Sequence, residues 1–354
     1  MLTLHNDEPP APSRSGSVLV NIDSSDPTSY LAAAMAANAA CDVVIVQHEF
    51  GIFGGPDGVF ILHLLDALRV PVVLTLHTVT PHFIATERDV LQRACARAAV
   101  VTVFTPTARE LLLNQGIADA TPIVIVPHGS PDALYNVSRS AARVSLDVSD
   151  CFVLSTFGLV SEGKGIELAI DALPAIVADR PDTVFVIAGR THPEVLKRDG
   201  ERYRECLIQQ VAAYGLTGHV RFVDGFLSVR AIAELLAATD VFLTPYVNPF
   251  QIVSGALTFA LAAGCPVVST PYQYARDSLA AGAGTVVESR DPAMFADAVL
   301  GYGLNPNAAA NARKAAHTFG SSTRWSAVGR VVANTCRDAT QSETRLGPNR
   351  ARSA

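Results

Sequence analysis

The sequence of 354 residues lacks any apolar run of the roughly 20 residues that a membrane-spanning helix requires. It also lacks a lysine- and arginine-rich run, and its formal net charge is −6. Because nucleic-acid-binding proteins present a basic face, we expect no nucleic-acid partner. The polar, proline-rich N-terminus MLTLHNDEPPAPSRSGS has no signal-peptide core. We therefore expect a cytoplasmic protein without a transmembrane segment, with peripheral contact to the inner face of the membrane left open.

Paired cysteines and several catalytic motifs are missing as well. The six cysteines are scattered without a C-x-x-C pair, which favours free thiols over a disulfide framework or a cysteine metal site. No D-x-D is present, so a metal-bridged diphosphate site is unsupported. The absence of G-x-G-x-x-G after a strand argues against a nicotinamide dehydrogenase, and the absence of G-x-S-x-G argues against α/β-hydrolase chemistry.

What the chain does contain is a regular alternation of short apolar runs and longer segments with helical spacing. Runs that are apolar throughout are typical of strands buried on both faces of a parallel sheet. Their alternation with helices indicates βαβ units and an α/β fold with two doubly wound parallel-sheet lobes. The expected strands are 18–22, 43–47, 71–76, 100–104, 123–126, 152–157, 183–188, 220–223, 241–244, 266–270 and 284–287.

A polar, turn-rich break at 127–150 divides these strands into two groups. Ligands of open α/β sheets bind outside the carboxyl ends of the strands, so we expect a site in a crevice there. The predicted organisation is a flexible N-terminus at 1–16, a first lobe at 17–132, a linker at 133–150, a second lobe at 151–318, a C-terminal helix packing back at 319–339 and a disordered tail at 340–354.

The segment STFGLVSEGKGIELAID (155–171) places a glycine-rich turn between a buried strand and a helix. Amides at such a turn attract anions, and Lys164 adds a full positive charge. The pattern indicates a phosphate-binding turn with Gly158, Gly163 and Lys164, and an ordinary βα turn is the alternative. A degenerate P-loop is a further alternative, but Gly165 stands where that loop needs a magnesium-binding Ser or Thr.

A second candidate lies in YVNPFQIVSGALTFALAAGCPVVSTPY (246–272). Ser254, Gly255 and Ala256 begin a short helix there and offer free backbone amides to an anion. Gln251 can donate and accept hydrogen bonds at once, which suits a sugar hydroxyl. The alternative is a packed helix in which Gly255 allows close approach.

Two expected strands of the first lobe end at histidines, His48 in VQHEFGIFGGPDG and His77 in VLTLHTVTPHF. A histidine at this edge can hydrogen-bond a sugar or transfer a proton, and a purely structural role is the alternative. Glu49, Gly54 and Gly55 lie in the same segment as His48, and Glu49 is the best-placed carboxylate of this lobe.

These segments, in this order, resemble the retaining GT-B glycosyltransferases of family 4 (glycosyl transferases group 1) over roughly residues 40–300. A subgroup with a QHEFGIFGG motif and a glutamine-led SG segment is most similar. The resemblance implies two Rossmann-like lobes, the first on the acceptor side and the second binding a nucleotide-sugar. It rests on DVVIVQHEFGIFGGPDG, VPVVLTLHT, IVIVPHG, FGLVSEGKG, VRFVDGFLS, TDVFLTPY and GALTFALAAGCPVVSTP.

The resemblance also implies a reaction and roles for residues. A hexose would pass from a nucleotide diphosphate donor to an acceptor hydroxyl on a glycan, a lipid-linked molecule or a small molecule. Lys164 would hold the donor diphosphate, and His77 and Gln251 would lie near the donor sugar. The base would lie near 220–226, which ends at Phe226, and 254–256 would contact sugar or phosphate. No metal or other cofactor is expected, because lysine and helix dipole offset the charge of the leaving diphosphate.

The sequence departs from the family pattern at several positions. Leu159 stands where an arginine is common, and Gln251 and Phe259 stand where two glutamates are typical. The glycine-rich loop that usually follows the first strand is not seen, which leaves open that the first βα unit is missing or rebuilt. These departures favour, as an alternative, a non-catalytic relative that binds nucleotide or carbohydrate. The sequence leaves the oligomeric state open.

Overall fold

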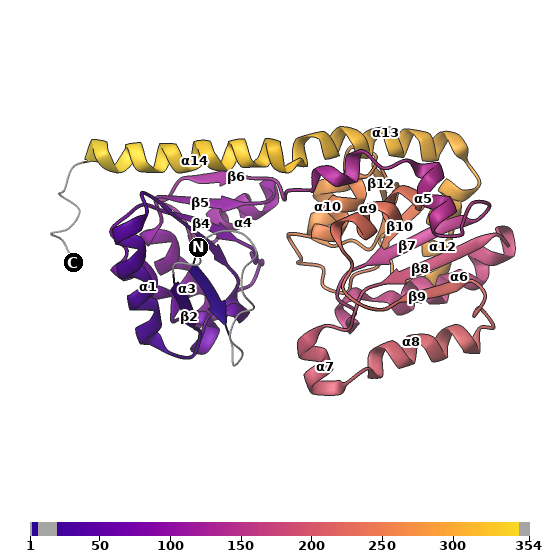
Figure 1. The fold of residues 1–354 in the computed structure, drawn as a ribbon, viewed down its shortest axis with the longest axis horizontal. Helices are drawn as coiled ribbons and strands as arrows, with labels where there is room; N and C mark the ends of the chain where they lie inside the picture. The colour runs from indigo at the N-terminus through magenta and orange to yellow at the C-terminus, as the bar shows by residue number, and fades with distance from the viewer. Residues whose placement is uncertain (1, 6–19, 347–354) are drawn as a thin grey trace. The chain divides into compact units, whose positions relative to one another are not determined.

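A computed structural model describes residues 2–5 and 20–346 of the chain. The chain divides into two compact units, unit 1 with Met1–Pro127 and Gly329–Ala354, and unit 2 with His128–Val328 (Figure 1). Each unit has a parallel sheet with helices packed on it. The predicted α/β fold with two Rossmann-like, doubly wound lobes is confirmed.

Unit 1 has a main sheet of four parallel strands in the order β3-β4-β5-β6, and a separate parallel pair, β1-β2. The strand β5 is buried at every residue and β4 at all but one, which explains their uninterrupted apolar sequence. The elements of this unit before α14 are β1 (Leu2–His5), β2 (Val20–Asp23), α1 (Pro27–Ala40), β3 (Val44–His48), α2 (Ile61–Ala67), β4 (Val72–Leu76), α3 (Ala85–Arg97), β5 (Val100–Val103), α4 (Pro106–Asn114) and β6 (Ile123–Ile125).

The two ends of the chain differ from the sequence prediction where they are described. Within the segment 1–16, expected to be flexible, Leu2–His5 forms β1 and pairs in parallel with β2. A strand therefore does precede β2, and the rest of that segment lies outside the described residues. At the other end, the helix α14 (Trp325–Leu346) extends through the first part of the tail expected at 340–354, and residues 347–354 lie outside the described range.

The helix α14 continues because its apolar residues recur at helical spacing and find a surface in unit 1. Cys336 packs against a small core of that unit, and Ala339 is buried in it together with Val73 and Val100. The single helix expected at 319–339 is instead the end of α13 (Pro306–Thr323) followed by α14.

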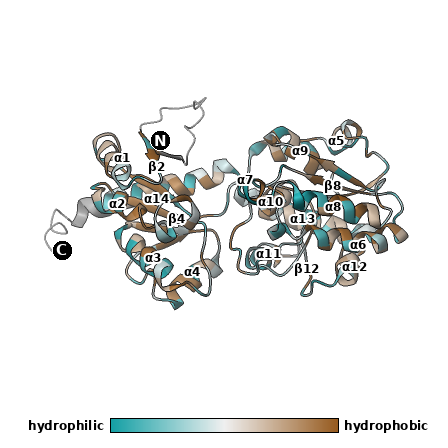
Figure 2. Ribbon diagram, turned by 90° about the horizontal axis from the view of Figure 1, so that it is seen from below, coloured by the Kyte–Doolittle hydropathy of each residue, from teal (hydrophilic) through white to brown (hydrophobic). Residues whose placement is uncertain are grey.

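Unit 2 has six parallel strands in the order β12-β11-β10-β7-β8-β9. Alternate side chains of its central strands enter two cores, Leu154 on one face and Val153 on the other. The hydropathy of these elements can be followed in Figure 2. Its elements are α5 (Arg139–Ser145), β7 (Phe152–Phe157), α6 (Ile166–Asp179), β8 (Thr183–Ala188), α7 (Pro193–Asp199), α8 (Arg202–Ala213), β9 (Val220–Val223), α9 (Val229–Ala238), β10 (Val241–Thr244), α10 (Gly255–Ala262), β11 (Val267–Ser269), α11 (Gln273–Leu279), β12 (Gly284–Val286), α12 (Pro292–Gly303) and α13.

The linker expected at 133–150 is instead an integral part of unit 2. Its helix α5 buries Ala142, and the following Val148 is buried with Val153 and Ala238. The polar composition of this segment suggested a linker because its arginines, which are engaged in contacts within the unit, look in sequence like solvated charges. No helix in the described part of the chain is long and apolar enough to cross a membrane.

Candidate functional site

The loops after β7 and β8 each contain a glycine that the backbone requires, Gly158 for its positive φ and Gly189 for its positive φ and its close approach to Gly158. Gly158 and Gly189 have φ angles of +135° and +137°. A Cβ atom on Gly189 would lie 1.8 Å from the carbonyl oxygen of Gly158. The amide of Gly158 donates to the carbonyl of Ala188 at 3.0 Å, which fixes the chain where it leaves the sheet.

Lys164 lies on the next turn, which packs against the loop after β10. Gly165 follows it with φ +60°, and a Cβ atom there would lie 2.1 Å from the carbonyl oxygen of Pro245. The Nζ atom of Lys164 lies 4.2 Å from the ring centre of Tyr246, a cation–π contact. Lys164 is half-buried and forms no ion pair with the described residues, so its charge is available to an anion.

The backbone of this turn offers less than the sequence predicts. The amides of Lys164 and Gly165 donate to carbonyls within the turn, at 2.9 and 3.0 Å. The next amide, that of Ile166, donates to the hydroxyl of Tyr203 at 3.1 Å. These three amides are therefore unavailable to an anion, and the side chain of Lys164 supplies the positive charge of the turn.

The start of α10 offers the backbone donors that the Lys164 turn lacks. Ser254 caps this helix, and its Oγ accepts the amide of Leu257 at 3.2 Å. The amides of Gly255 and Ala256 donate to no acceptor among residues 2–5 and 20–346. A Cβ atom on Gly255 would lie 3.3 Å from Cε1 of His128, so glycine leaves room for this imidazole. Two free amides beside a histidine make this helix start suitable for an anion.

Tyr246 links the Lys164 turn to the loop before α11. Its ring stacks on that of Tyr272 with the centres 5.0 Å apart, and the two residues are 2% and 1% exposed. Burial raises the pKa of Tyr272 well above its ordinary value, so the phenol stacked on Tyr246 stays neutral. Neither Tyr246 nor His128 was predicted from the sequence, although Tyr246 ends the motif TDVFLTPY and His128 lies in IVIVPHG.

Gln251 is partly committed to its own loop. The side-chain Nε2 of Gln251 donates to the backbone carbonyl of Val253 at 2.8 Å. The backbone carbonyl of Gln251 accepts the amide of Tyr274 at 2.9 Å. These bonds hold the segment before α10 against α11. The sugar-binding role of Gln251 stays a prediction.

Two phenylalanines of unit 2 have opposite surroundings. Phe226 is 83% exposed after β9, and the guanidinium of Arg190 lies 5.8 Å from its ring centre. Phe259 packs its ring against Phe157 and His128, each with a centre-to-centre distance of 6.2 Å. An exposed ring can serve as a platform for a flat ligand, whereas Phe259 completes an apolar cluster and offers no hydrogen bond.

In unit 1, His48 and His77 lie at the carboxyl ends of the neighbouring strands β3 and β4. The amide of His77 donates to the carbonyl of His48 at 3.0 Å. Nε2 of His77 lies 2.7 Å from Oε1 of Gln47, an atom that only accepts, so Nε2 carries a proton and Nδ1 is left as the acceptor of the neutral ring. Gln47 was not singled out in the sequence, where it precedes the more conspicuous His48.

His48 itself is fully buried. Its ring lies against Phe50 and Phe53, with centres 5.0 and 5.6 Å away, and neither ring nitrogen has a hydrogen-bond partner among the described residues. Burial lowers the pKa of His48 to about 4, with the nearby His77 adding to this effect. Burial also lowers the pKa of His77. Both imidazoles are therefore neutral near pH 7.

The other residues predicted in unit 1 are held by local contacts. Glu49 accepts a hydrogen bond from the hydroxyl of Thr78 at 2.5 Å. A Cβ atom on Gly54 would lie 1.7 Å from the carbonyl oxygen of Ser24, and Gly55 has φ +76°. Close packing and a left-handed backbone thus account for the two glycines, and their acceptor-side role stays a prediction. Within the described ranges, no three His, Cys, Asp or Glu side chains gather closely enough to hold a metal ion.

Comparisons with known families place both units. Residues 142–319 match the family described as glycosyl transferases group 1, and residues 17–132 match the one described as glycosyltransferase family 4. A phosphatidyl-myo-inositol mannosyltransferase of Mycobacterium leprae is 30% identical over 248 residues, which are 66% of this chain and 59% of the relative. The lipopolysaccharide core biosynthesis mannosyltransferase LpsB of Rhizobium meliloti is 27% identical over 177 residues, 48% of this chain and 46% of LpsB. The matches thus span about half of these relatives' lengths.

Solved structures share the fold. Anabaena Alr3699/HepE in complex with UDP superimposes with a TM-score of 0.74 at 21% identity, over 88% of this chain and 82% of that one. Sucrose-phosphate synthase from Thermosynechococcus elongatus gives 0.72 at 19% identity, over 89% and 78%. At these identities the similarity concerns the fold, which is the GT-B arrangement of two Rossmann-like lobes.

Proposed function

The chain belongs to the glycosyl transferases group 1 family, and we propose that it transfers a hexosyl group from a nucleoside diphosphate sugar to an acceptor hydroxyl. One observation carries this proposal: Lys164 lies at the carboxyl end of the unit 2 sheet and has no acidic partner in the described part of the chain. Family membership leaves no support for the P-loop alternative, and Gly165 supplies no hydroxyl for magnesium.

In the proposed reaction, unit 2 stabilises the leaving group. As the bond from the anomeric carbon to the diphosphate oxygen breaks, negative charge grows on the diphosphate. Lys164 and the free amides of Gly255 and Ala256 would stabilise this charge, because preorganised positive groups stabilise charge that develops as a bond breaks. This is why we propose catalysis without a metal ion.

We further propose that the sugar keeps its anomeric configuration, by front-side displacement assisted by the donor's own phosphate. The two carboxylates that flank Lys164 in the chain, Glu162 and Glu167, pair with Arg198 and Arg290 instead, which favours no carboxylate as a nucleophile. Gln251 and His77 would orient the sugar, with His77 held by Gln47. Phe226 would lie near the base, and His48, Glu49, Gly54 and Gly55 on the acceptor side.

For the acceptor, we propose a hydroxyl of a glycan, a lipid-linked molecule or a small molecule. The names of two relatives, which refer to phosphatidyl-myo-inositol and to the lipopolysaccharide core, favour a lipid-linked one. A protein working on such an acceptor would act in the cytoplasm, peripherally at the inner face of the membrane.

The test is transfer from UDP-, GDP- and ADP-sugars, with nucleoside diphosphate release and product NMR as readouts. We expect release with one class of donor, full activity in excess EDTA, and a product with the anomeric configuration of the donor. Loss of activity in EDTA would refute the metal-independent part, and an inverted product would refute retention.

The packing of Phe259 favours a second candidate function, that of a non-catalytic relative that binds nucleotide or carbohydrate. A ring committed to Phe157 and His128 cannot hold a ribose hydroxyl pair. This candidate predicts tight donor binding without turnover in the same assay. Release of nucleoside diphosphate that depends on Lys164 would exclude it.

A further inference from the structure

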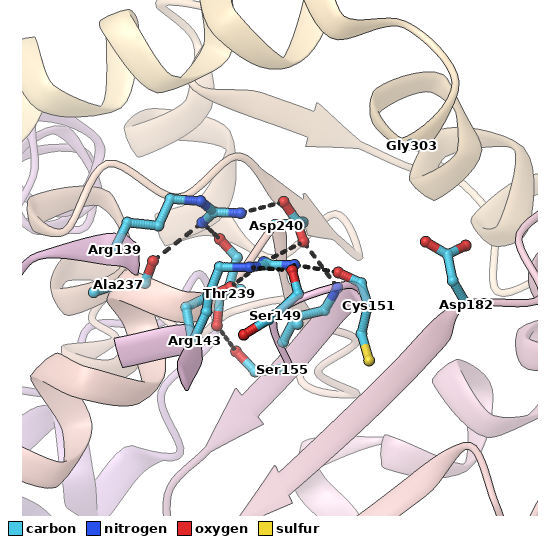
Figure 3. A network of polar contacts seen from close by, with 12 residues as sticks. Arg139, Arg143, Ser149, Cys151, Ser155, Asp182, Ala237, Thr239, Asp240 and Gly303 are labelled. Atoms are coloured by element: carbon cyan, nitrogen blue, oxygen red, sulfur yellow. Dashed lines mark hydrogen bonds and ion pairs between the residues drawn. The ribbon is translucent and has the colours of Figure 1, made fainter. Parts of the chain in front are cut away.

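A cluster of arginines lies in unit 2 at the amino ends of β7 and β10. This is the opposite end of the sheet from Lys164. Asp240 directly precedes β10, and its Oδ2 accepts the amide of Val153 in β7 at 2.9 Å. Arg139 and Arg143 of α5 and Arg313 of α13 all pair with this one carboxylate, at 2.5, 3.1 and 3.5 Å. Figure 3 shows Arg139 and Arg143 turned toward Asp240.

Arg139 and Arg143 each use both Nη atoms in contacts that hold unit 2 together. Arg139 donates to the carbonyl of Ala237 at 3.1 Å, and Arg143 to that of Ala238 at 2.9 Å. Both carbonyls belong to the end of α9, where cations offset the negative end of the helix dipole. These bonds explain why α5 folds onto unit 2, and they also restrict both guanidiniums.

Arg313 is engaged much less completely. Only its Nη2 makes hydrogen bonds, to the carbonyls of Thr239 and Asp240 at 3.3 and 3.4 Å and to Oδ1 of Asp240 at 3.5 Å. Its Nε and Nη1 donate to no acceptor within the described ranges. By contrast, Arg180 at the same end of the sheet forms a bidentate pair with Asp182 at 2.8 and 2.9 Å. Arg313 thus retains donors for an additional anion.

The charges around Asp240 do not balance. Three guanidiniums share one carboxylate, whose two oxygens already accept from those arginines and from the β7 amide. Burial lowers the pKa of Arg139 against the opposing effect of Asp240, and the positive charges of Arg313 and Arg143 lower it further, so the arginines repel one another. A small anion bound among these arginines would reduce their mutual repulsion. This positive cluster lies in a chain whose net charge is −6.

A cavity of about 480 Å³ lies at this cluster. It is lined by the three arginines, by Arg180, and by the first turns of α13, including Ala309 and Ala310. The amino end of α13 adds partial positive charge to the same cavity. The acidic residues of the lining are Asp150, Asp182 and Asp240, so four arginines face three carboxylates.

We propose that this cavity binds a phosphate group, as inorganic phosphate or as part of a small phosphorylated sugar, with Arg313 as its main ligand. A guanidinium with free donors binds phosphate oxygens through charge-assisted, often bidentate, hydrogen bonds. The site is distinct from the Lys164 turn, because the strands β7 and β10 run between the two. It does not depend on the proposed transferase activity.

The test is a calorimetric titration of the full chain with inorganic phosphate and, separately, with a hexose 6-phosphate, at constant ionic strength. We expect binding that weakens about tenfold or more in Arg313→Gln, since a hydrogen bond to a charged group is lost. Ala310→Glu provides a second variant that removes no protein contact and places a carboxylate at an exposed position of the lining. The controls are Lys164→Ala, which alters the other end of the sheet, and Arg276→Gln, whose partner is the exposed Glu288.

Binding that is lost in both cavity variants and kept in both controls would support the site, and the stronger of the two ligands would identify the source of the phosphate. Three results would overturn it: no binding of either ligand at millimolar concentration, equal binding in Arg313→Gln and wild type, or loss of binding in Lys164→Ala alone.

Discussion

The carboxyl ends of the two main sheets carry different kinds of functional group. In unit 2 this edge carries Lys164, a cation that stacks on Tyr246 and has no acidic partner in the described part of the chain. In unit 1 it carries His48 and His77, whose pKa values are both lowered by burial. A fixed charge suits an anionic diphosphate, and neutral imidazoles suit hydroxyl groups. We therefore propose that the two sheets bind different ligand groups through the side chains at their strand ends.

The largest effect should come from removing the cation of unit 2. Lys164→Ala is expected to lower kcat/KM by about 10²–10³-fold, the usual loss when a group that stabilises transition-state charge is removed. The measurement is the rate of nucleoside diphosphate release. Lys197→Ala, which removes an exposed lysine paired with Glu194, is the matched control. Similar rates for the two variants would remove Lys164 from the mechanism.

The next largest effect should come from a substitution in the backbone turn that carries Lys164. Gly165→Ala is expected to lower the free energy of unfolding by about 3 kcal/mol, because φ +60° disfavours a Cβ atom that would also lie 2.1 Å from the carbonyl oxygen of Pro245. Urea unfolding followed by circular dichroism measures this. At Gly163 the nearest atom to an added Cβ is 3.9 Å away, so Gly163→Ala should be much milder. Equal losses would show that the turn is not packed as described.

The buried imidazole of unit 1 should appear as a pH dependence of stability. The pKa of His48 is about 4 in the folded chain and about 6.5 when unfolded, so only the unfolded state takes up a proton between these values. The stability that neutral His48 contributes is complete above pH 6.5 and falls as the pH drops toward 4. Between pH 7 and 4.5 the loss should be about 2 kcal/mol.

Urea unfolding at those two pH values checks this, with His48→Gln as the variant that cannot titrate. His48→Gln should lose less stability on acidification than wild type by about that amount. His63→Gln, which replaces an exposed histidine of α2, controls for the loss of an imidazole in itself. An unchanged pH dependence in His48→Gln would mean that His48 is not buried in neutral form.

The smallest effect should come from Gln47, which we propose to act through His77. Gln47→Leu removes the acceptor that holds the Nε2 proton and should lower kcat about fivefold, or ~1 kcal/mol, with little change in KM. Gln47→Glu keeps an acceptor and should restore most of the rate while raising the apparent pKa of His77 in the pH–rate profile. Equal rates in both variants and wild type would show that His77 needs no such support.

The two sheets and the residues at their strand ends could largely be predicted from the sequence, because the apolar runs are long enough to define the buried strands. Their ends then located Lys164, His48 and His77, and all three lie at carboxyl ends of parallel strands or in the loops that follow. A sequence pattern does not show which acceptor each amide or side chain donates to in the folded chain. The amides of Lys164, Gly165 and Ile166 looked available, but carbonyls of the same turn and the hydroxyl of Tyr203 accept their hydrogen bonds.

Long-range partners explain the other differences. The arginines of α5 suggested a linker because their partner, Asp240, is about a hundred residues away in the chain. The strand β1 is short, and it forms only because β2 pairs with it. Tyr246 and His128 were missed because their contacts, Lys164 and Gly255, come from other loops.

The central claim is that Lys164 binds the diphosphate of a nucleotide-sugar, and thermal unfolding with UDP-, GDP- and ADP-sugars tests it most directly. A ligand that binds only the folded chain adds about 2.7 kcal/mol of stability at one hundred times its Kd. We predict that one class of donor raises the Tm of wild type and that Lys164→Ala largely removes this rise. If no nucleotide-sugar raises the Tm, or if Lys164→Ala responds as wild type does, the claim is contradicted.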